Sequence, residues 1–248
     1  MSINKQIFFS ALTVVVIILQ GCNKQGAGCF DKAGDIKTAS VEVAAFTSID
    51  VSSNVDVQLL TDGLNRVEVS TGENLLAGIS LKVEEGVLLI DNLNSCFWSN
   101  GYTHPLVAIR NPNLTKLIQH GYGNIYTTDT LVVDNLLVQV EDASGGFDLT
   151  LQSNLLRVVS NSLGPITLRG VTQSLNAGHY LSDGILYAKE LLVQDCHITH
   201  NGSNRMELNV INKLSGAVNS IGNVYLYGQK PALINVELTN KGVIINKF

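Results

Sequence analysis

The sequence is poor in charge, proline and aromatic side chains, and these shortages exclude several classes of protein. Charged residues make up 15% of the 248 residues, against roughly 25% in an ordinary soluble domain. The 16 Lys and Arg are outnumbered by 21 Asp and Glu, so the chain lacks the basic face with which nucleic-acid binders neutralise phosphates. The 45% hydrophobic content excludes a disordered chain. No stretch of ten residues carries a helical period.

Only one long apolar run is present, and it lies at the N-terminus. Ile7–Leu19 has thirteen residues, which suits a signal-peptide core and is shorter than the roughly 20 residues that cross a bilayer. Lys5 precedes it, and Leu19-Gln20-Gly21-Cys22 ends it and resembles a bacterial lipobox. We therefore expect residues 1–21 to be a lipoprotein signal peptide and Cys22 to carry anchoring acyl chains. The alternative is an ordinary signal peptide with an incidental cysteine.

The rest of the chain is expected to be one body on a tether. Residues 22–40 are interpreted as the lipidated cysteine and a flexible tether, and 41–248 as a single domain. Without residues 1–21 the chain keeps 15 basic and 21 acidic residues, a net charge of −6. No acidic run follows Cys22, and in Bacteroidetes lipoproteins such a run often accompanies surface export. We expect a membrane-anchored envelope protein at the outer membrane, with the periplasmic face slightly favoured over the cell surface.

Four cysteines are present, at positions 22, 29, 96 and 196. With Cys22 acylated, three remain in an oxidising compartment, and an odd number leaves one free. We expect a Cys29–Cys96 disulfide that pins the start of the domain onto its body. Cys196 lies in an alternating, strand-like stretch and is expected to be a buried small hydrophobic residue. No pair has the CxxC spacing of a zinc or thioredoxin-type site.

From Phe46 onward the chain consists of short β-branched runs broken by Gly, Asn, Asp and Ser. Segments such as Val55–Leu59 and Leu81–Val83 alternate apolar and polar residues, as half-buried strands do. Glu84–Gly86 is predicted to be a hairpin turn. Glu73–Ala77 is the one segment that suggests a helical turn. The body is therefore predicted to be all-β.

The second half contains a repeat that is marked by glycine. Seven glycines recur at intervals of 18 to 23 residues: Gly123, Gly146, Gly164, Gly184, Gly202, Gly222 and Gly242. Apolar runs lie before and after most of them, and no helix intervenes, which is typical of a β-solenoid. We predict a solenoid with rungs of about 20 residues, repetitive over 116–248 and less regular over 41–115, with a β-sandwich as the alternative. At its corners glycine is expected to supply positive φ and stacked asparagines to form amide ladders.

Several segments of the body resemble one known family. They are Phe46–Val51, Gly72–Leu76, Gly86–Ile90, Gly121–Ile125 and Gly222–Pro231. Their order resembles the family described as putative auto-transporter adhesin, head GIN domain, a domain family of unknown function in Bacteroidetes lipoproteins. The resemblance covers about residues 45–248 and implies a right-handed, single-stranded β-helix-like fold and no established chemistry. Cys29-Phe30 and Asn94–Trp98 resemble paired cysteine segments of one subgroup, which supports the Cys29–Cys96 bridge.

No catalytic, metal or cofactor pattern is found, and we predict none. His197 and His200 are three residues apart on a strand, so they point to opposite faces and do not chelate one ion. Cys196 and His197 are neighbours and point apart as well. Two acidic pairs, Glu84–Glu85 and Glu141–Asp142, are expected at solvated corners. The isolated histidines are expected at turns or on the surface; these are His104, His120 and His179.

Exposed tyrosines carry the functional hypothesis, because aromatic rings on a flat β-face stack on sugars or anchor a protein partner. Six tyrosines could serve this role: Tyr122, Tyr126, Tyr180, Tyr187, Tyr225 and Tyr227. The predicted binding residues among them are Tyr122, Tyr126, Tyr225 and Tyr227. The alternative places them in the core or at a cap. The predicted function is non-catalytic binding, adhesion or scaffolding in the cell envelope, with the membrane, an envelope protein or a glycan as partner and no nucleic acid. The alternatives are a polysaccharide lyase or hydrolase on a β-helix and a purely structural envelope protein.

Overall fold

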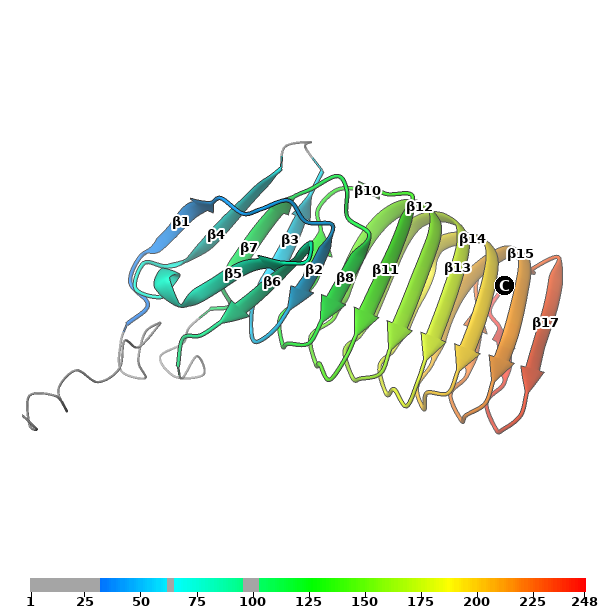
Figure 1. The fold of residues 1–248 in the computed structure, drawn as a ribbon. Coiled ribbons are helices and arrows are strands. Elements are labelled where there is room, and N and C mark those ends of the chain that lie inside the picture. Colours follow the sequence, from blue (N-terminus) through cyan, green and yellow to red (C-terminus); the bar gives the residue numbers. More distant parts are fainter. Residues whose placement is uncertain (1–31, 62–64, 96–102) are drawn as a thin grey trace, which may run out of the picture.

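The computed structural model describes residues 32–61, 65–95 and 103–248, which form a long stack of strands (Figure 1). The strands are β1 (Ile36–Val41), β2 (Ser48–Val51), β3 (Asp56–Leu60), β4 (Arg66–Gly72), β5 (Ile79–Glu84), β6 (Val87–Asn92), β7 (Leu106–Arg110), β8 (Lys116–Gln119), β9 (Ile125–Thr127), β10 (Leu131–Val132), β11 (Asn135–Val140), β12 (Phe147–Ser160), β13 (Ile166–His179), β14 (Leu186–His200), β15 (Met206–Val218), β16 (Val224–Leu226), β17 (Leu233–Leu238) and β18 (Ile244–Asn246). One short 3-10 helix, η1 (Leu76–Gly78), lies between β4 and β5.

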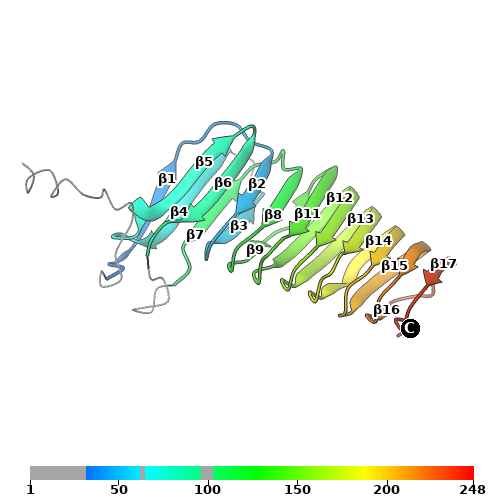
Figure 2. The ribbon, with the colours of Figure 1, turned by 60° about the horizontal axis from the view of Figure 1, so that its bottom comes forward.

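The strands form two walls that face each other across the core. Wall A runs in the order β5, β6, β2, β8 and β11, continues through the C-terminal halves of β12 to β15, and ends with β17. Wall B runs in the order β1, β4, β7, β3 and β9, continues through the N-terminal halves of β12 to β15, and ends with β16 and β18. Figures 1 and 2 show this stack from two directions.

The register confirms the predicted solenoid. From β8 and β9 onward every pairing is parallel, so each turn of the chain lies on the one before it. One inward column of wall B is Ile125, Phe147, Ile166, Leu186, Met206, Val224 and Ile244. Its members are 18 to 22 residues apart, which matches the rung length predicted from the glycine spacing.

The alternation of apolar and polar residues decides what lies inside. In β12, for example, Leu149, Leu151 and Leu156 are buried, whereas Asp148 and Gln152 are exposed. The inward side chains of both walls form one continuous core along the stack. Each fully buried Val, Leu or Ile stabilises the fold by about 1.5–3 kcal/mol relative to an exposed one. No single turn can bury its own apolar face, so neighbouring turns depend on one another.

The seven repeat glycines are required for a different reason from the predicted one. None of them has a positive φ. Among the described glycines, those that do are Gly34, Gly86, Gly170, Gly216 and Gly228. Instead, a Cβ at Gly123 would lie 1.9 Å from the carbonyl oxygen of Val55, and one at Gly146 would lie 2.0 Å from that of Pro165. The corners of successive turns therefore pack backbone against backbone, and no side chain fits between them.

The N-terminal end is built differently. Its three antiparallel pairings, β1 with β4, β4 with β7 and β5 with β6, lie in the described part before β8. β5 and β6 form the hairpin predicted at Glu84–Gly86, with positive φ at Glu85 and Gly86. η1 lies close to the predicted helical turn. Residues 36–40 were expected to belong to the tether, but they lie in the sheet, because β1 begins at Ile36 and pairs along its whole length with β4.

Asparagine side chains link the corners of successive turns. Asn219 donates to the side-chain oxygen of Asn201 over 3.0 Å, and Thr239 of the next turn donates to Asn219 over 2.9 Å. Such contacts are the amide ladders expected from the sequence. Among the described residues, no helix is long and apolar enough to cross a membrane.

Candidate functional site

An outward-facing line of tyrosines on wall B is the strongest candidate site. The register places one column of side chains across β9, β12 to β16 and β18: Tyr126, Asp148, Thr167, Tyr187, Glu207, Tyr225 and Ile245. We call its three aromatic members, Tyr126, Tyr187 and Tyr225, the tyrosine column. Because neighbouring strands are about 4.8 Å apart, the two-rung step from Tyr187 to Tyr225 spans about 10 Å.

Two of the four predicted tyrosines belong to this column, and a third lies beside it. Tyr227 is two residues beyond Tyr225 and follows the end of β16. Tyr122 lies in the corner between β8 and β9, with its side chain 59% exposed, and is not part of wall B. Tyr187 was not selected from the sequence, although its distance from the repeat glycine Gly184 resembles that of Tyr225 from Gly222. The sequence feature that identifies Tyr187 is therefore its offset of three residues from a repeat glycine.

A half-buried ion pair lies between two rings of the column. Glu207 lies between Tyr187 and Tyr225 in the register, and it is 6% exposed although its strand position faces outward. Arg205 binds its carboxylate with Nε at 2.7 Å, and the Arg205 guanidinium lies 5.4 Å from the centre of the Tyr187 ring. The hydrogen bond to Glu207 raises the pKa of Arg205. The pair therefore positions a cation over the Tyr187 ring before any ligand binds.

Two lysines extend this arrangement toward the C-terminal end. The Lys247 ammonium lies 5.7 Å from the centre of the Tyr225 ring, and that of Lys189 lies 5.9 Å from the Tyr227 ring. At this range the cations are attracted by the negative faces of the rings. The surface thus alternates aromatic faces with hydrogen-bond donors, a combination that suits a ligand with both C–H faces and hydroxyl groups.

A groove of about 480 Å³ lies beside the N-terminal member of the column. Tyr126, Asp148, Thr167 and Arg169 are among its lining residues. Arg169 binds Asp148 and also reaches Glu190 over 3.3 Å, and the hydrogen bond to Asp148 raises the pKa of Arg169. Both carboxylates are therefore engaged by one cation. Burial, and to a smaller extent the charge of Asp56, raises the pKa of Tyr126, so this phenol stays protonated.

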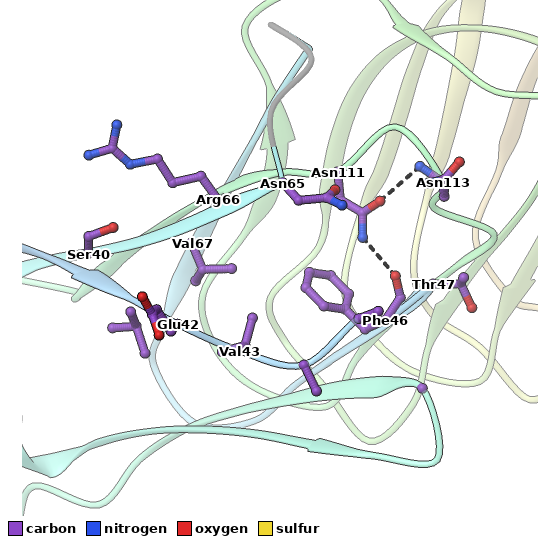
Figure 3. A pocket seen from close by; sticks show the side chains of 14 residues that line it. Ser40, Glu42, Val43, Phe46, Thr47, Asn65, Arg66, Val67, Asn111 and Asn113 are labelled. Carbon is purple, nitrogen blue, oxygen red and sulfur yellow. Dashed lines mark hydrogen bonds between the residues drawn. The ribbon is translucent and has the colours of Figure 1, made fainter.

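A larger cavity of about 570 Å³ opens where the chain crosses from wall B to wall A (Figure 3). Its lining combines apolar side chains, including Val43, Phe46 and Val67, with several asparagines. Asn111 is fixed there, because its amide donates to the carbonyl oxygen of Phe46 and its side-chain oxygen accepts from the Asn113 N–H, both over 2.8 Å. The volume is typical of a small-molecule site.

A cluster of acid and imidazole lies on wall A. His120 Nε2 is 3.6 Å from Asp50 Oδ2 and 3.8 Å from Glu141 Oε2. Burial raises the pKa of Asp50, Glu141 raises it further, and His120 and Lys116 lower it. Groups of this kind carry out acid–base chemistry in enzymes. Sequence analysis did not associate these three residues, because they lie in three different turns of the chain.

The other histidines differ in their environments. His197 is exposed and its ring lies 3.3 Å from the Ser215 hydroxyl, whereas His200 is fully buried, which confirms that the two point to opposite faces. His104 is exposed, and its Nδ1 lies 3.2 Å from Asp56 Oδ1, as suits a surface residue. The prediction for His179 is wrong: it is fully buried beside His200, because the register brings an inward position of β13 against one of β14. Across the described residues, no group of three or more His, Cys, Asp or Glu could hold a metal ion.

Of the four cysteines, only Cys196 lies within the described residues. Cys196 is a free, buried thiol, as expected. Burial raises its pKa to about 12. The predicted lipidation residue Cys22 and the predicted disulfide partners Cys29 and Cys96 lie outside the described residues.

The parallel stack and the ordered outer column define a β-solenoid with a surface suited to binding. The family model described as Putative auto-transporter adhesin, head GIN domain matches residues 45–229. The chain belongs to this family, as its segments indicated. The match ends before the last turn, which contains β17 and β18.

Solved structures share the fold at low sequence identity. A putative adhesin from Bacteroides fragilis superposes with a TM-score of 0.76 at 21% identity, over 89% of this chain and 100% of that one. A putative adhesin from Parabacteroides distasonis has a TM-score of 0.64 at 18% identity, over 89% and 99%. A protein from the same organism described as a putative lipid binding protein has a TM-score of 0.58 at 15% identity, over 88% and 98%. A comparison with curated proteins finds no significant match.

Proposed function

We propose that this protein is a lipid-anchored component of the cell envelope that binds a glycan, without catalysis, along the tyrosine column. The observation that carries the proposal is the alternation of Tyr187, Glu207 and Tyr225 on successive rungs, with Arg205 holding the carboxylate between the rings. Two rings about 10 Å apart on one flat wall offer stacking platforms to separate sugar units of one chain. Arg205 and the lysines supply donors for the hydroxyl groups between them.

The family supports a binding role rather than a particular ligand. Its description names an adhesin, and the solved relatives are described as adhesins or as a lipid binding protein. Attachment through Cys22 would keep the walls close to a membrane, where envelope glycans are concentrated. An envelope protein that packs on the same tyrosines is the competing partner.

Binding should be tested with the full chain and glycans from the cell envelope, by calorimetry and by retention on immobilised glycan. We expect Tyr187→Ala and Tyr225→Ala each to weaken binding tenfold or more, as truncation of a buried aromatic anchor does. Tyr180→Ala is the matched control, because Tyr180 is 43% exposed but lies after β13, away from the column. Equal binding by all three variants would contradict the proposed site.

The enzyme alternative has a specific place in the structure, the cluster of Asp50, His120 and Glu141. It predicts that the purified protein releases new reducing ends or unsaturated sugars and that His120→Ala abolishes the release. Our proposal predicts no release and unchanged binding by His120→Ala. Release by the unsubstituted protein would overturn the non-catalytic role.

The membrane face decides which glycans the protein meets. Protease and antibody accessibility on intact cells, compared with lysed cells, separates the two faces. Exposure on intact cells would favour adhesion or capture of external glycan. Protection until lysis would favour a periplasmic ligand, which is the face expected from the sequence.

A further inference from the structure

The C-terminal end of the solenoid finishes on two strand edges. β17 pairs with β15, and β18 pairs with β16, and in the described chain no strand lies on their outer sides. The exposure of equivalent residues shows what a further turn would cover. Val218 is 0% exposed, whereas Leu238, which occupies the same inward position one turn later, is 47% exposed.

The edge of β17 carries few of the features that protect natural edge strands. Such strands are commonly interrupted by proline or a bulge, or carry lysine or an inward-pointing charge. β17 has the sequence Leu-Ile-Asn-Val-Glu-Leu, with one charge, at Glu237, on its outward face. Its inward residues, Ile234, Val236 and Leu238, continue the apolar core of the preceding turns. A strand added here would gain backbone hydrogen bonds and cover an apolar surface at the same time.

The sequence of β17 is close to symmetric about Val236, which identifies the kind of strand that fits. In an antiparallel pair, residues directly opposite each other lie on the same face of the sheet. If β17 pairs with a second β17 centred on Val236, Ile234 lies opposite Leu238 and Val236 lies opposite itself. On the outward face, Asn235 lies opposite Glu237, and its amide can donate to that carboxylate. Centring on Asn235 instead would oppose Leu233 and Glu237, an apolar side chain and a charge.

We propose that two copies of this chain associate end to end through their C-terminal turns, with β17 paired antiparallel to β17 of the second copy. A twofold axis normal to the walls, midway between the two Val236 residues, joins wall A of one copy to wall A of the other. The same axis brings the two β18 edges to the same side, so the core continues across the junction. The opposite end does not offer this match. Its edge strand in wall B, β1, carries Lys37, and its edge strand in wall A, β5, carries Lys82 and Glu84. This proposal does not depend on the glycan site.

The association should be measured with the full chain, by sedimentation velocity over a wide range of protein concentration. We expect a monomer–dimer equilibrium, with backbone amides of 233–238 exchanging more slowly with solvent as the dimer forms. Leu238→Lys places a charge against an apolar residue at two symmetric positions and should raise the dissociation constant tenfold or more. Leu163→Lys is the matched control, since Leu163 is 62% exposed in a corner far from β17, and it should leave the constant unchanged.

Charge at Asn235 tests the register itself, because this exposed residue contributes little to the fold of a single copy. In Asn235→Lys, the new lysine of each copy would lie opposite Glu237 of the other copy. The dissociation constant should fall about fivefold, whereas in Asn235→Glu it should rise by a similar factor. A monomer at every concentration, or a dimer that Leu238→Lys does not weaken, would overturn the proposal. The same response to both charges at position 235 would also overturn it, because the antiparallel register would then be wrong.

Discussion

His179 and His200 occupy the same inward position on successive turns, and their rings meet edge to face with centroids 5.5 Å apart. Both side chains are 0% exposed, and within the described structure none of their four ring nitrogens makes a hydrogen bond of normal geometry. Their neighbours in the column, Ser160 and Val218, carry no charge. The core therefore contains two imidazoles that are stable only in their neutral form.

The first prediction is a loss of stability in mild acid. Burial lowers the pKa of His179 from 6.5 to about 3, with His200 adding to the shift. Burial also lowers the pKa of His200, and the nearby backbone of Asn204 opposes part of that change. Below pH 6.5 these two histidines bind protons more readily in the unfolded chain than in the folded one. The free energy of unfolding therefore decreases as the pH falls. His179 should contribute a slope of about 1.4 kcal/mol per pH unit, and His200 should add to it in the same direction.

Urea unfolding between pH 7 and pH 4 measures this slope. His179→Leu should keep the fold and reduce the slope, because one of the two protonation sites of the unfolded chain is then removed. His197→Leu is the control, since His197 is exposed, and it should leave the slope close to that of the unsubstituted protein. An unchanged slope in His179→Leu would show that other groups control the acid response.

The second prediction separates the two roles of glycine. Gly123→Ala puts a methyl group against the carbonyl oxygen of Val55 and should destabilise the protein by about 3 kcal/mol. Gly86→Ala meets nothing within 4 Å and pays only for a φ of +78°, so it should cost about 1 kcal/mol. Thermal or urea unfolding of both variants gives the comparison. Equal losses would mean that the close approach of the corners is not what requires glycine.

The third prediction concerns the free thiol. Because burial raises the pKa of Cys196 to about 12, almost no thiolate forms at neutral pH. Cys196 should therefore resist alkylating reagents in the folded protein and react only on unfolding. Peptide mapping by mass spectrometry, with and without urea, follows this residue separately from the other cysteines. Rapid labelling of Cys196 in the folded chain would contradict its placement in the core.

The fourth prediction is the Cys29–Cys96 disulfide. The bridge closes a loop of 67 residues, so its removal should cost about 4 kcal/mol of stability. Non-reducing peptide mapping would identify the bridge directly. Cys29→Ser and Cys96→Ser should each lower the unfolding midpoint, and the double variant should lower it no further. Detection of both residues as free thiols would disprove it.

The sequence predicted the solenoid because the repeat leaves two separate signals. One is strict alternation within strands, visible in Val55–Leu59, and the other is the glycine that recurs near every corner. The predicted role of glycine, which was to supply positive φ at the corners, was wrong. The actual constraint is the close contact of Gly123 with Val55, and these two residues are far apart in sequence. Alternation alone cannot indicate such contacts.

The site was less predictable, because membership of a column depends on exact register. β-bulges lie between Thr167 and Arg169 and again within β14. They vary the interval between equivalent positions along the strands. Tyr126, Tyr187 and Tyr225 each follow a repeat glycine by three residues, but they lie three and two turns apart, so no single interval connects them. The contact of His179 with His200 went unpredicted because it too depends on the register. Parity along the strand indicates which face a residue takes, but the register decides which neighbours it meets.

The stacking of parallel turns has a consequence for how this molecule can change over time. Each turn touches only the turns before and after it, so total stability is close to a sum of local terms. Duplication or deletion of one complete turn would leave every other contact in place and alter the length by about 4.8 Å. The length of wall B is thus set by the number of turns that the chain contains.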